Sequence, residues 1–292
     1  KFHDTWLPEI QTTGNGIANF SFDVPHSHPL GLISVILMFN GSSTLHSSGT
    51  VITTITVRSP TNLTINPILA NPTAGDTFTV EGTLSSSNGS GIIDRNGNTI
   101  PASLTFSIDG QSSTFTVTGG SVSPNGTWSA DIRLDLTFPR GTHTLLATYT
   151  PSVNYYGSGS GEADFDSRGY TLLSILDPLD LDPDRRTVRG DSINVTISLI
   201  DNAGQPVVAE SVGIYVEGNL ESTGLTDSNG TMSTTITVDS LRVPGPLVIS
   251  ADFEGINGTT GLLGDQTSTR VIILAPSVLE INSITGSAIA GE

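Results

Sequence analysis

The stretch PNGTWSADI at residues 124–132 joins an Asn-Gly turn to an alternating strand, and the same pattern occurs twice more. It returns as GNGIANFSF at residues 14–22 and as SNGTMSTTI at residues 228–236. The Asn-Gly pairs are 110 and 104 residues apart (125 − 15 and 229 − 125). A proline follows each copy, and the glycine after that proline keeps the same intervals (141 − 31 and 245 − 141). The chain is therefore built from repeats of roughly 100 residues.

Each repeat continues with an alternating apolar strand, a Gly/Ser-rich loop and a predicted closing strand. The alternating strands are residues 32–39, 144–149 and 247–253, and the predicted closing strands are residues 51–57, 170–175 and 270–274. Earlier segments repeat as well, because residues 74–80 resemble 189–195 and residues 97–110 resemble 204–218. This gives about seven short strands per repeat, as in a β-sandwich. Asn-Gly between such strands predicts a type I′ hairpin turn.

The pattern predicts an all-β chain of tandem immunoglobulin-like β-sandwich domains. The expected divisions are an incomplete domain with C-terminal strands only (1–60), two complete domains (61–175 and 176–276), and a linker with the first strand of a further repeat (277–292). Two interpretations of the open ends remain. The favoured one is that the chain is part of a longer protein. The other is strand addition, in which the tail completes the open sandwich of a neighbouring copy.

The composition limits the partners and the compartment. The formal net charge is −17, which disfavours nucleic acid and anionic membrane surfaces as partners. The sequence has no apolar run long enough to span a membrane. It has no cysteine, and Lys1 is its only lysine, so neither a disulfide nor a Lys–Asn isopeptide bond staples the complete repeats. This favours a prokaryotic extracellular protein over an animal one.

Three segments carry a family resemblance: residues 201–207, residues 226–231, and the strand 147–149 with the loop 155–158. In these segments the chain resembles the bacterial and archaeal Ig-like ("Big") repeats of S-layer proteins, adhesins and extracellular filaments. It implies an extracellular or cell-surface location and a structural role in a prokaryotic assembly (S-layer, sheath, stalk or filament), with an archaeal source favoured. The partners would be copies of the chain or neighbouring surface proteins.

Two other functions remain open. One is an adhesin or carbohydrate-binding module that uses loops at the sandwich ends to bind glycans. Aromatic side chains would then stack on sugar rings, and the candidates are Trp6, Trp128, Tyr155 and Tyr156, although a core position is favoured for Trp128. The less favoured one is an accessory arm of a secreted hydrolase.

Two acidic groups are candidate metal sites. The linker group, at residues 176–191, is Asp177, Asp180, Asp182, Asp184 and Asp191, whose oxygen atoms suit Ca²⁺. The favoured interpretation is a solvated acidic linker whose carboxylates pair with Arg185, Arg186 and Arg189. The second group is Glu162, Asp164 and Asp166, placed on one side of a loop before the closing strand, where an exposed polar face is favoured over metal.

Eight Asn-X-Ser/Thr sequons are candidate glycosylation sites. Their asparagines are Asn19, Asn40, Asn62, Asn88, Asn125, Asn194, Asn229 and Asn257. Asn125 and Asn229 occupy the same turn in successive repeats, where turn chemistry alone also explains an asparagine.

The sequence predicts no catalytic site and no enzyme activity. Residues 157–161 match Gly-X-Ser-X-Gly formally, but a nucleophile elbow needs a strand-to-helix turn, so a flexible loop is expected. His26 and His28, with His3 and His46 elsewhere, lack the pattern of a zinc site and are interpreted as loop histidines.

Overall fold

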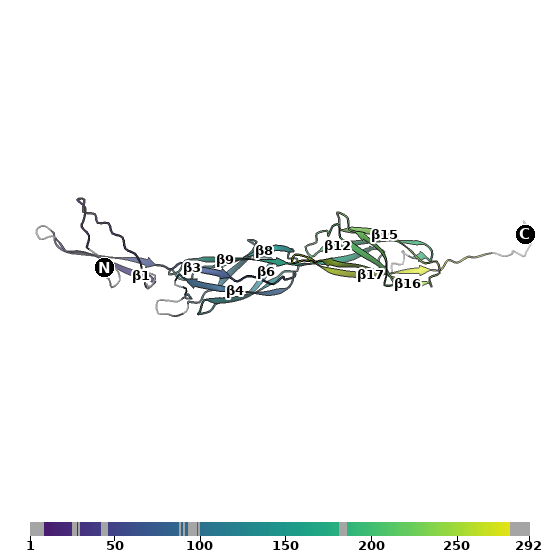
Figure 1. The fold of residues 1–292 in the computed structure, drawn as a ribbon, viewed down its shortest axis with the longest axis horizontal. Helices are drawn as coiled ribbons and strands as arrows, with labels where there is room; N and C mark the ends of the chain where they lie inside the picture. The colour runs from purple at the N-terminus through teal and green to yellow at the C-terminus, as the bar shows by residue number, and fades with distance from the viewer. Residues whose placement is uncertain are drawn as a thin grey trace, which may run out of the picture. The chain divides into compact units, whose positions relative to one another are not determined.

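The computed structural model describes residues 9–24, 28, 30–41, 46–87, 89, 91–92, 98, 100–180 and 186–280. The chain divides into two compact units, Lys1–Ser167 and Arg168–Glu292. All seventeen elements in the described residues are β-strands, and Figure 1 shows the strands within residues 61–167 and within residues 169–274 as packed layers. No helix with the length and hydrophobicity of a membrane span occurs in those residues.

The second repeat is a complete seven-stranded sandwich. Its strands are β3 (Thr61–Ile65), β4 (Thr77–Ser86), β5 (Leu104–Ile108), β6 (Phe115–Val122), β7 (Thr127–Leu134), β8 (Gly141–Tyr149) and β9 (Gly159–Ser167). One sheet has the order β3-β4-β7-β6 and the other β5-β8-β9. The first sheet thus contains the first, second, fifth and fourth strands of the repeat, in that order. The second sheet contains the third, sixth and seventh strands. This is the strand order of the immunoglobulin fold. Alternate residues of β4 and β7 are buried between the sheets.

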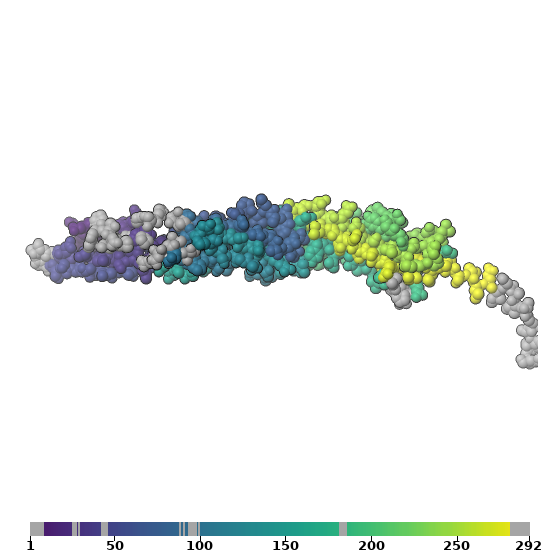
Figure 2. Space-filling view, turned by 90° about the horizontal axis from the view of Figure 1, so that it is seen from below, coloured from purple at the N-terminus to yellow at the C-terminus, as the bar shows by residue number. Residues whose placement is uncertain are grey.

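The third repeat has the same core strands, with one added short strand and two changed pairings. Its strands are β10 (Gly169–Asp177), β11 (Thr187–Val188), β12 (Ser192–Asp201), β13 (Ser211–Val216), β14 (Asn219–Leu225), β15 (Thr231–Thr237), β16 (Gly245–Ile256) and β17 (Leu262–Leu274). In the third repeat, β14 pairs with β13, the strand before it in the chain. In the second repeat, β6 pairs instead with β7, the strand after it. In Figure 2, yellow atoms late in this unit lie beside teal atoms from its start, consistent with the parallel pairing of β10 and β17.

The first repeat contributes one hairpin, β1 (Gly31–Phe39) and β2 (Gly49–Val57). These strands begin 110 residues before β8 and β9 (141 − 31 and 159 − 49). Ile33, Val35 and Val57 form its small core. Residues 17–22, which correspond to the start of β7, form no strand. In the second repeat, β7 forms its backbone hydrogen bonds with β4 and β6. Of the residues 110 positions before β6, the structure describes 9–12, and these form no strand.

The assignment of residues 170–175 as a closing strand is wrong. They lie in β10, which pairs with β12, and Leu173 belongs to the core of the Arg168–Glu292 unit. The closing strand of the second repeat is β9, so the predicted division between residues 175 and 176 falls inside a strand. Alternation identifies the buried face of a strand and not its partner. The divisions at 60/61 and 276/277 stay predictions.

The predicted turn type is also wrong. Gly126 N–H donates to Ser123 O and Ser123 N–H to Thr127 O, with Gly126 at φ +87° and Asn125 at negative φ. This is a three-residue loop in which a left-handed glycine follows a type I turn. The same bonds close the turns at residues 13–17 and 227–231. Positive φ at both central residues, the condition for type I′, occurs instead at 109–110 and 217–218.

Candidate functional site

The second repeat contains a serine, a histidine and an aspartate in hydrogen-bond contact. His143 Nδ1 lies 2.7 Å from Asp109 Oδ2, and its Nε2 lies 3.1 Å from Ser167 Oγ and 3.0 Å from Pro139 O. Asp109 follows β5, His143 lies in β8 and Ser167 ends β9. This cluster was not predicted from the sequence, because its members are far apart in the chain.

The arrangement is formally that of a nucleophilic triad, but the burial does not fit catalysis. Ser167 is fully buried and its hydroxyl donates to Pro139 O at 2.9 Å. His143 is 7% exposed, and its ring packs edge-on against Phe138 and beside Phe165. A substrate carbonyl cannot approach such a hydroxyl without opening the sandwich. The cluster instead ties three strand ends together, and the absence of enzyme activity stays a prediction.

Asp109 makes this cluster sensitive to acid. Partial burial raises the pKa of Asp109, but hydrogen bonds from His143 and from the Thr144 backbone N–H outweigh it and hold the pKa below the ordinary 3.8. A carboxyl group whose pKa is lower in the folded chain than in the unfolded chain stabilises the fold at pH values above its unfolded pKa. This stabilisation is lost as the pH falls through the folded pKa. We therefore expect Asp109→Asn to destabilise the second repeat near neutral pH and to cost little in strong acid. Urea unfolding against pH measures this difference, and a difference that stays constant into acid would contradict it.

The linker carboxylates that the structure describes do not converge. Asp180 accepts from Arg270 Nε at 3.0 Å, from its Nη2 at 2.8 Å and from its backbone N–H at 2.9 Å. The hydrogen bonds from the Arg270 side chain are the main reason that the pKa of Asp180 lies below its ordinary value. The partner is thus Arg270, 90 residues away, rather than a linker arginine. Asp182, Asp184 and Arg185 lie outside the described residues, within which no group of three or more His, Cys, Asp or Glu side chains could hold a metal.

The second acidic group lies on the closing strand itself, not in a loop before it. Glu162, Asp164 and Asp166 alternate along β9, as predicted for one face. Asp164 Oδ1 accepts from Thr144 Oγ1 and Asp166 Oδ1 from Thr142 Oγ1, each at 2.7 Å. Threonines on the neighbouring strand β8 therefore satisfy two of the three carboxylates.

The Gly/Ser segment 157–161 is partly strand as well. Gly159 and Gly161 lie in β9, where a Cβ on Gly161 would sit 2.7 Å from Leu63 O of β3. Glycine allows this close approach of the two sheets. Of the histidines, His28 is half-buried and His46 exposed, whereas His3 and His26 lie outside the described residues.

Two of the four aromatic candidates for sugar stacking are in the core. Trp128 and Tyr156 are each 3% exposed, and Tyr155 is half-buried. The core position predicted for Trp128 is confirmed. Trp6 lies outside the described residues. Buried rings cannot stack on a sugar, so Trp128 and Tyr156 do not form a carbohydrate platform.

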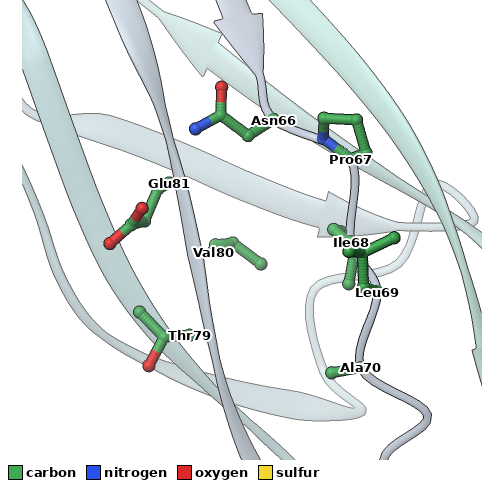
Figure 3. A pocket seen from close by; sticks show the side chains of 8 residues that line it. All are labelled: Asn66, Pro67, Ile68, Leu69, Ala70, Thr79, Val80 and Glu81. Carbon is green, nitrogen blue, oxygen red and sulfur yellow. The ribbon is translucent and has the colours of Figure 1, made fainter.

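A hollow of about 310 Å³ lies between residues 66–70, which follow β3, and residues 79–81 of β4. Figure 3 shows Val80 directed toward Ile68, with the side chains of Thr79 and Glu81 on the other side of the strand. The lining side chains are apolar apart from Asn66, Thr79 and Glu81. Glu81 is the only titratable side chain among these lining residues, so the hollow has no pair of groups for acid–base catalysis.

The first repeat exposes part of its own core face. Leu37 and Phe39 continue the alternation of the buried Ile33 and Val35 along β1. Val51 of β2 pairs with Leu37 and lies on the same face. These three exposed residues, Leu37, Phe39 and Val51, are here called the open core face. They are 41%, 48% and 62% exposed. The residues 110 positions later than Leu37 and Phe39 are Ala147 and Tyr149, which are 0% and 1% exposed in the complete repeat. In the part of the first repeat that the structure describes, no second sheet covers the open core face.

No protein-family model matches the chain, and no curated protein matches its sequence. Among solved structures, the Escherichia coli adhesin FdeC is 15% identical, over 84% of this chain and 74% of FdeC, with a TM-score of 0.37. The tetra-tandem repeat of a large adhesion protein is 16% identical, over 84% and 58%, with a TM-score of 0.37. The Clostridium thermocellum CbhA fibronectin(III)-like modules are 10% identical, over 86% and 100%, with a TM-score of 0.29. These similarities assign no function. The strand order described above makes the chain a tandem array of Ig-like β-sandwiches.

Proposed function

We propose that the chain is a structural repeat segment of a prokaryotic cell-surface or extracellular assembly, such as an S-layer, sheath, stalk or filament, with an archaeal source favoured. The observation that carries this proposal is the open core face, next to two complete sandwiches of the same repeat. An apolar sandwich interior needs a second sheet to cover it. Strands of the same repeat type are the matching cover, supplied by a neighbouring copy or a neighbouring surface protein.

The test is self-association of the chain. We expect the 292-residue protein to form oligomers in sedimentation velocity and regular filaments or sheets in electron micrographs. Phe39→Asp with Val51→Asp places two charges on the open core face and should shift the protein to monomers, because burying an unpaired charge is costly. Met38→Asp is the matched control, since Met38 is 53% exposed and points from β1 to the opposite face. A monomeric wild-type protein, or equal effects of both changes, would reject the proposal.

The adhesin or carbohydrate-binding alternative stays open but loses support, because Trp128 and Tyr156 are buried. Binding of the monodisperse protein to a glycan array would favour it over assembly. A calcium ion at residues 176–191 also stays a proposal, supported by the carboxylates of that segment. A melting temperature that EDTA leaves unchanged would remove it.

A further inference from the structure

The described sequons of the two complete repeats fall into two structural classes. Asn62 and Asn194 lie in strands β3 and β12, whereas Asn125, Asn229 and Asn257 lie in turns. All five asparagines are exposed, so exposure does not separate them.

The classes differ in where the sequon hydroxyl is hydrogen-bonded. In the Asn62 sequon, Thr64 Oγ1 lies 2.8 Å from Thr83 Oγ1 of the neighbouring strand β4. In the Asn229 sequon, Thr231 Oγ1 donates to Asp227 Oδ2 at 3.0 Å, within the same turn.

The side chains of the Asn194 sequon are hydrogen-bonded to a neighbouring strand of the sheet. Thr235 Oγ1 of β15 donates to Asn194 Oδ1 at 2.9 Å, and Thr196 Oγ1 lies 2.9 Å from Ser233 Oγ of the same strand. Both side chains that define the sequon are therefore bound to β15. A transferase that takes hold of the asparagine and of the hydroxyl residue must first separate β12 from β15.

The sequon of Asn125 is ready for recognition in the folded chain. Asn125 Oδ1 accepts from the backbone N–H of Thr127 at 3.1 Å and from its Oγ1 at 2.8 Å. The carboxamide and the hydroxyl thus lie side by side on an exposed turn. Both contacts are made by the carboxamide oxygen, so they leave Nδ2, the atom to which a sugar is attached, directed away from the Thr127 contacts.

The turn sequons also lie at the same end of their sandwiches. In the third repeat, Gly230 O accepts from Leu199 N near the end of β12, and Gly261 O accepts from Gly169 N at the start of β10. In the second repeat, Gly126 O accepts from Leu84 N near the end of β4. The end of β4 pairs with the start of β3. Each turn is therefore at the end where the first strand begins.

We propose that N-linked sugars are attached at the turn sequons Asn125, Asn229 and Asn257 of the folded protein and not at the strand sequons Asn62 and Asn194. The donor is a polyprenyl-pyrophosphate-linked oligosaccharide. The Nδ2–C1 bond forms, the bond between C1 and the phosphate oxygen breaks with its electrons leaving on the pyrophosphate, and the Nδ2 proton passes to a base of the transferase. Sugars then surround the loops at one end of each sandwich, which makes those loops a shielded surface.

This inference takes only the extracellular location from the proposed function, and its test is independent of assembly. The folded chain is incubated with an oligosaccharyltransferase and its lipid-linked donor, and occupancy at each asparagine is measured by glycopeptide mass spectrometry. We expect Asn194 and Asn62 to be at least about tenfold less occupied than Asn125. Urea-unfolded chain and a peptide spanning residues 123–129 are the controls, and both should be modified.

Two matched variants sharpen the result. Asn125→Gln should remove one glycan from the intact mass, whereas Asn194→Gln should remove none. Equal occupancy of strand and turn sequons in the folded chain would overturn the proposal. Modification of the peptide without modification of any turn in the folded chain would overturn it too.

Discussion

Replacing Trp128 by alanine is expected to lower the free energy of unfolding of the second repeat by about 3–5 kcal/mol, as measured for large aromatic side chains removed from cores. Trp128 is 3% exposed, and its ring lies 5.7 Å from that of Phe106, centroid to centroid. The indole covers Gly82, where a Cβ would sit 2.5 Å from Trp128 Cζ2. The ring thus fills the space between the two sheets beside a glycine that has no side chain to collapse into the cavity.

Urea unfolding followed by circular dichroism measures the loss. The matched control is Trp128→Met, because Met232 occupies the equivalent position of the third repeat and is 6% exposed there. Methionine should retain part of the stability. The core of the Arg168–Glu292 unit does not include Trp128, so its own transition should not move. A loss of less than about 1 kcal/mol would place the indole outside the core.

Gly230→Ala is expected to destabilise the third repeat by about 2–4 kcal/mol, from left-handed strain and from overpacking. Gly230 has φ +71°, a conformation that costs an L side chain energy. A Cβ there would also sit 2.4 Å from Leu199 O, and that contact is with backbone. The hydrogen bond from Leu199 N to Gly230 O, 2.8 Å long, would have to shift with it.

Gly204→Ala separates the two costs. Gly204 closes a turn of the same kind at φ +77°, but a Cβ there meets no atom of the described residues within 4 Å. Its replacement should cost only the conformational strain, about 1–2 kcal/mol. Both variants are compared with wild type by urea unfolding of the same unit. Equal losses would show that the contact with Leu199 contributes nothing.

The repeat interval predicted much of the architecture. It aligned the strand β1 with β8, and alternation identified the buried residues of strands such as β7. The counterpart of β2 was placed at residues 170–175, whereas the structure gives it as β9. The partner of residues 170–175 could not be predicted in this way, since alternation is the same for a first and a last strand. The turn type at Asn125-Gly126 was mispredicted because only the glycine, and not the asparagine, has positive φ.

The side-chain contacts of the candidate sites were less predictable. His143 and Asp109 are 34 residues apart, and Asp180 and Arg270 are 90 apart. Such pairs form only when the sheet order places their strands together. The linker and β9 carboxylates were visible in the sequence as acidic groups, but their partners were not.

The PNGTWSADI stretch and its two counterparts determined, by sequence alone, that the chain is an all-β repeat array, because side-chain alternation and turn residues act over a few neighbouring positions. The tertiary structure decided which strands pair, which carboxylates are satisfied, and that Leu37, Phe39 and Val51 of the first repeat lie uncovered. The physical reason is that burial and ion pairing depend on contacts between segments far apart in the chain, which local pattern does not specify.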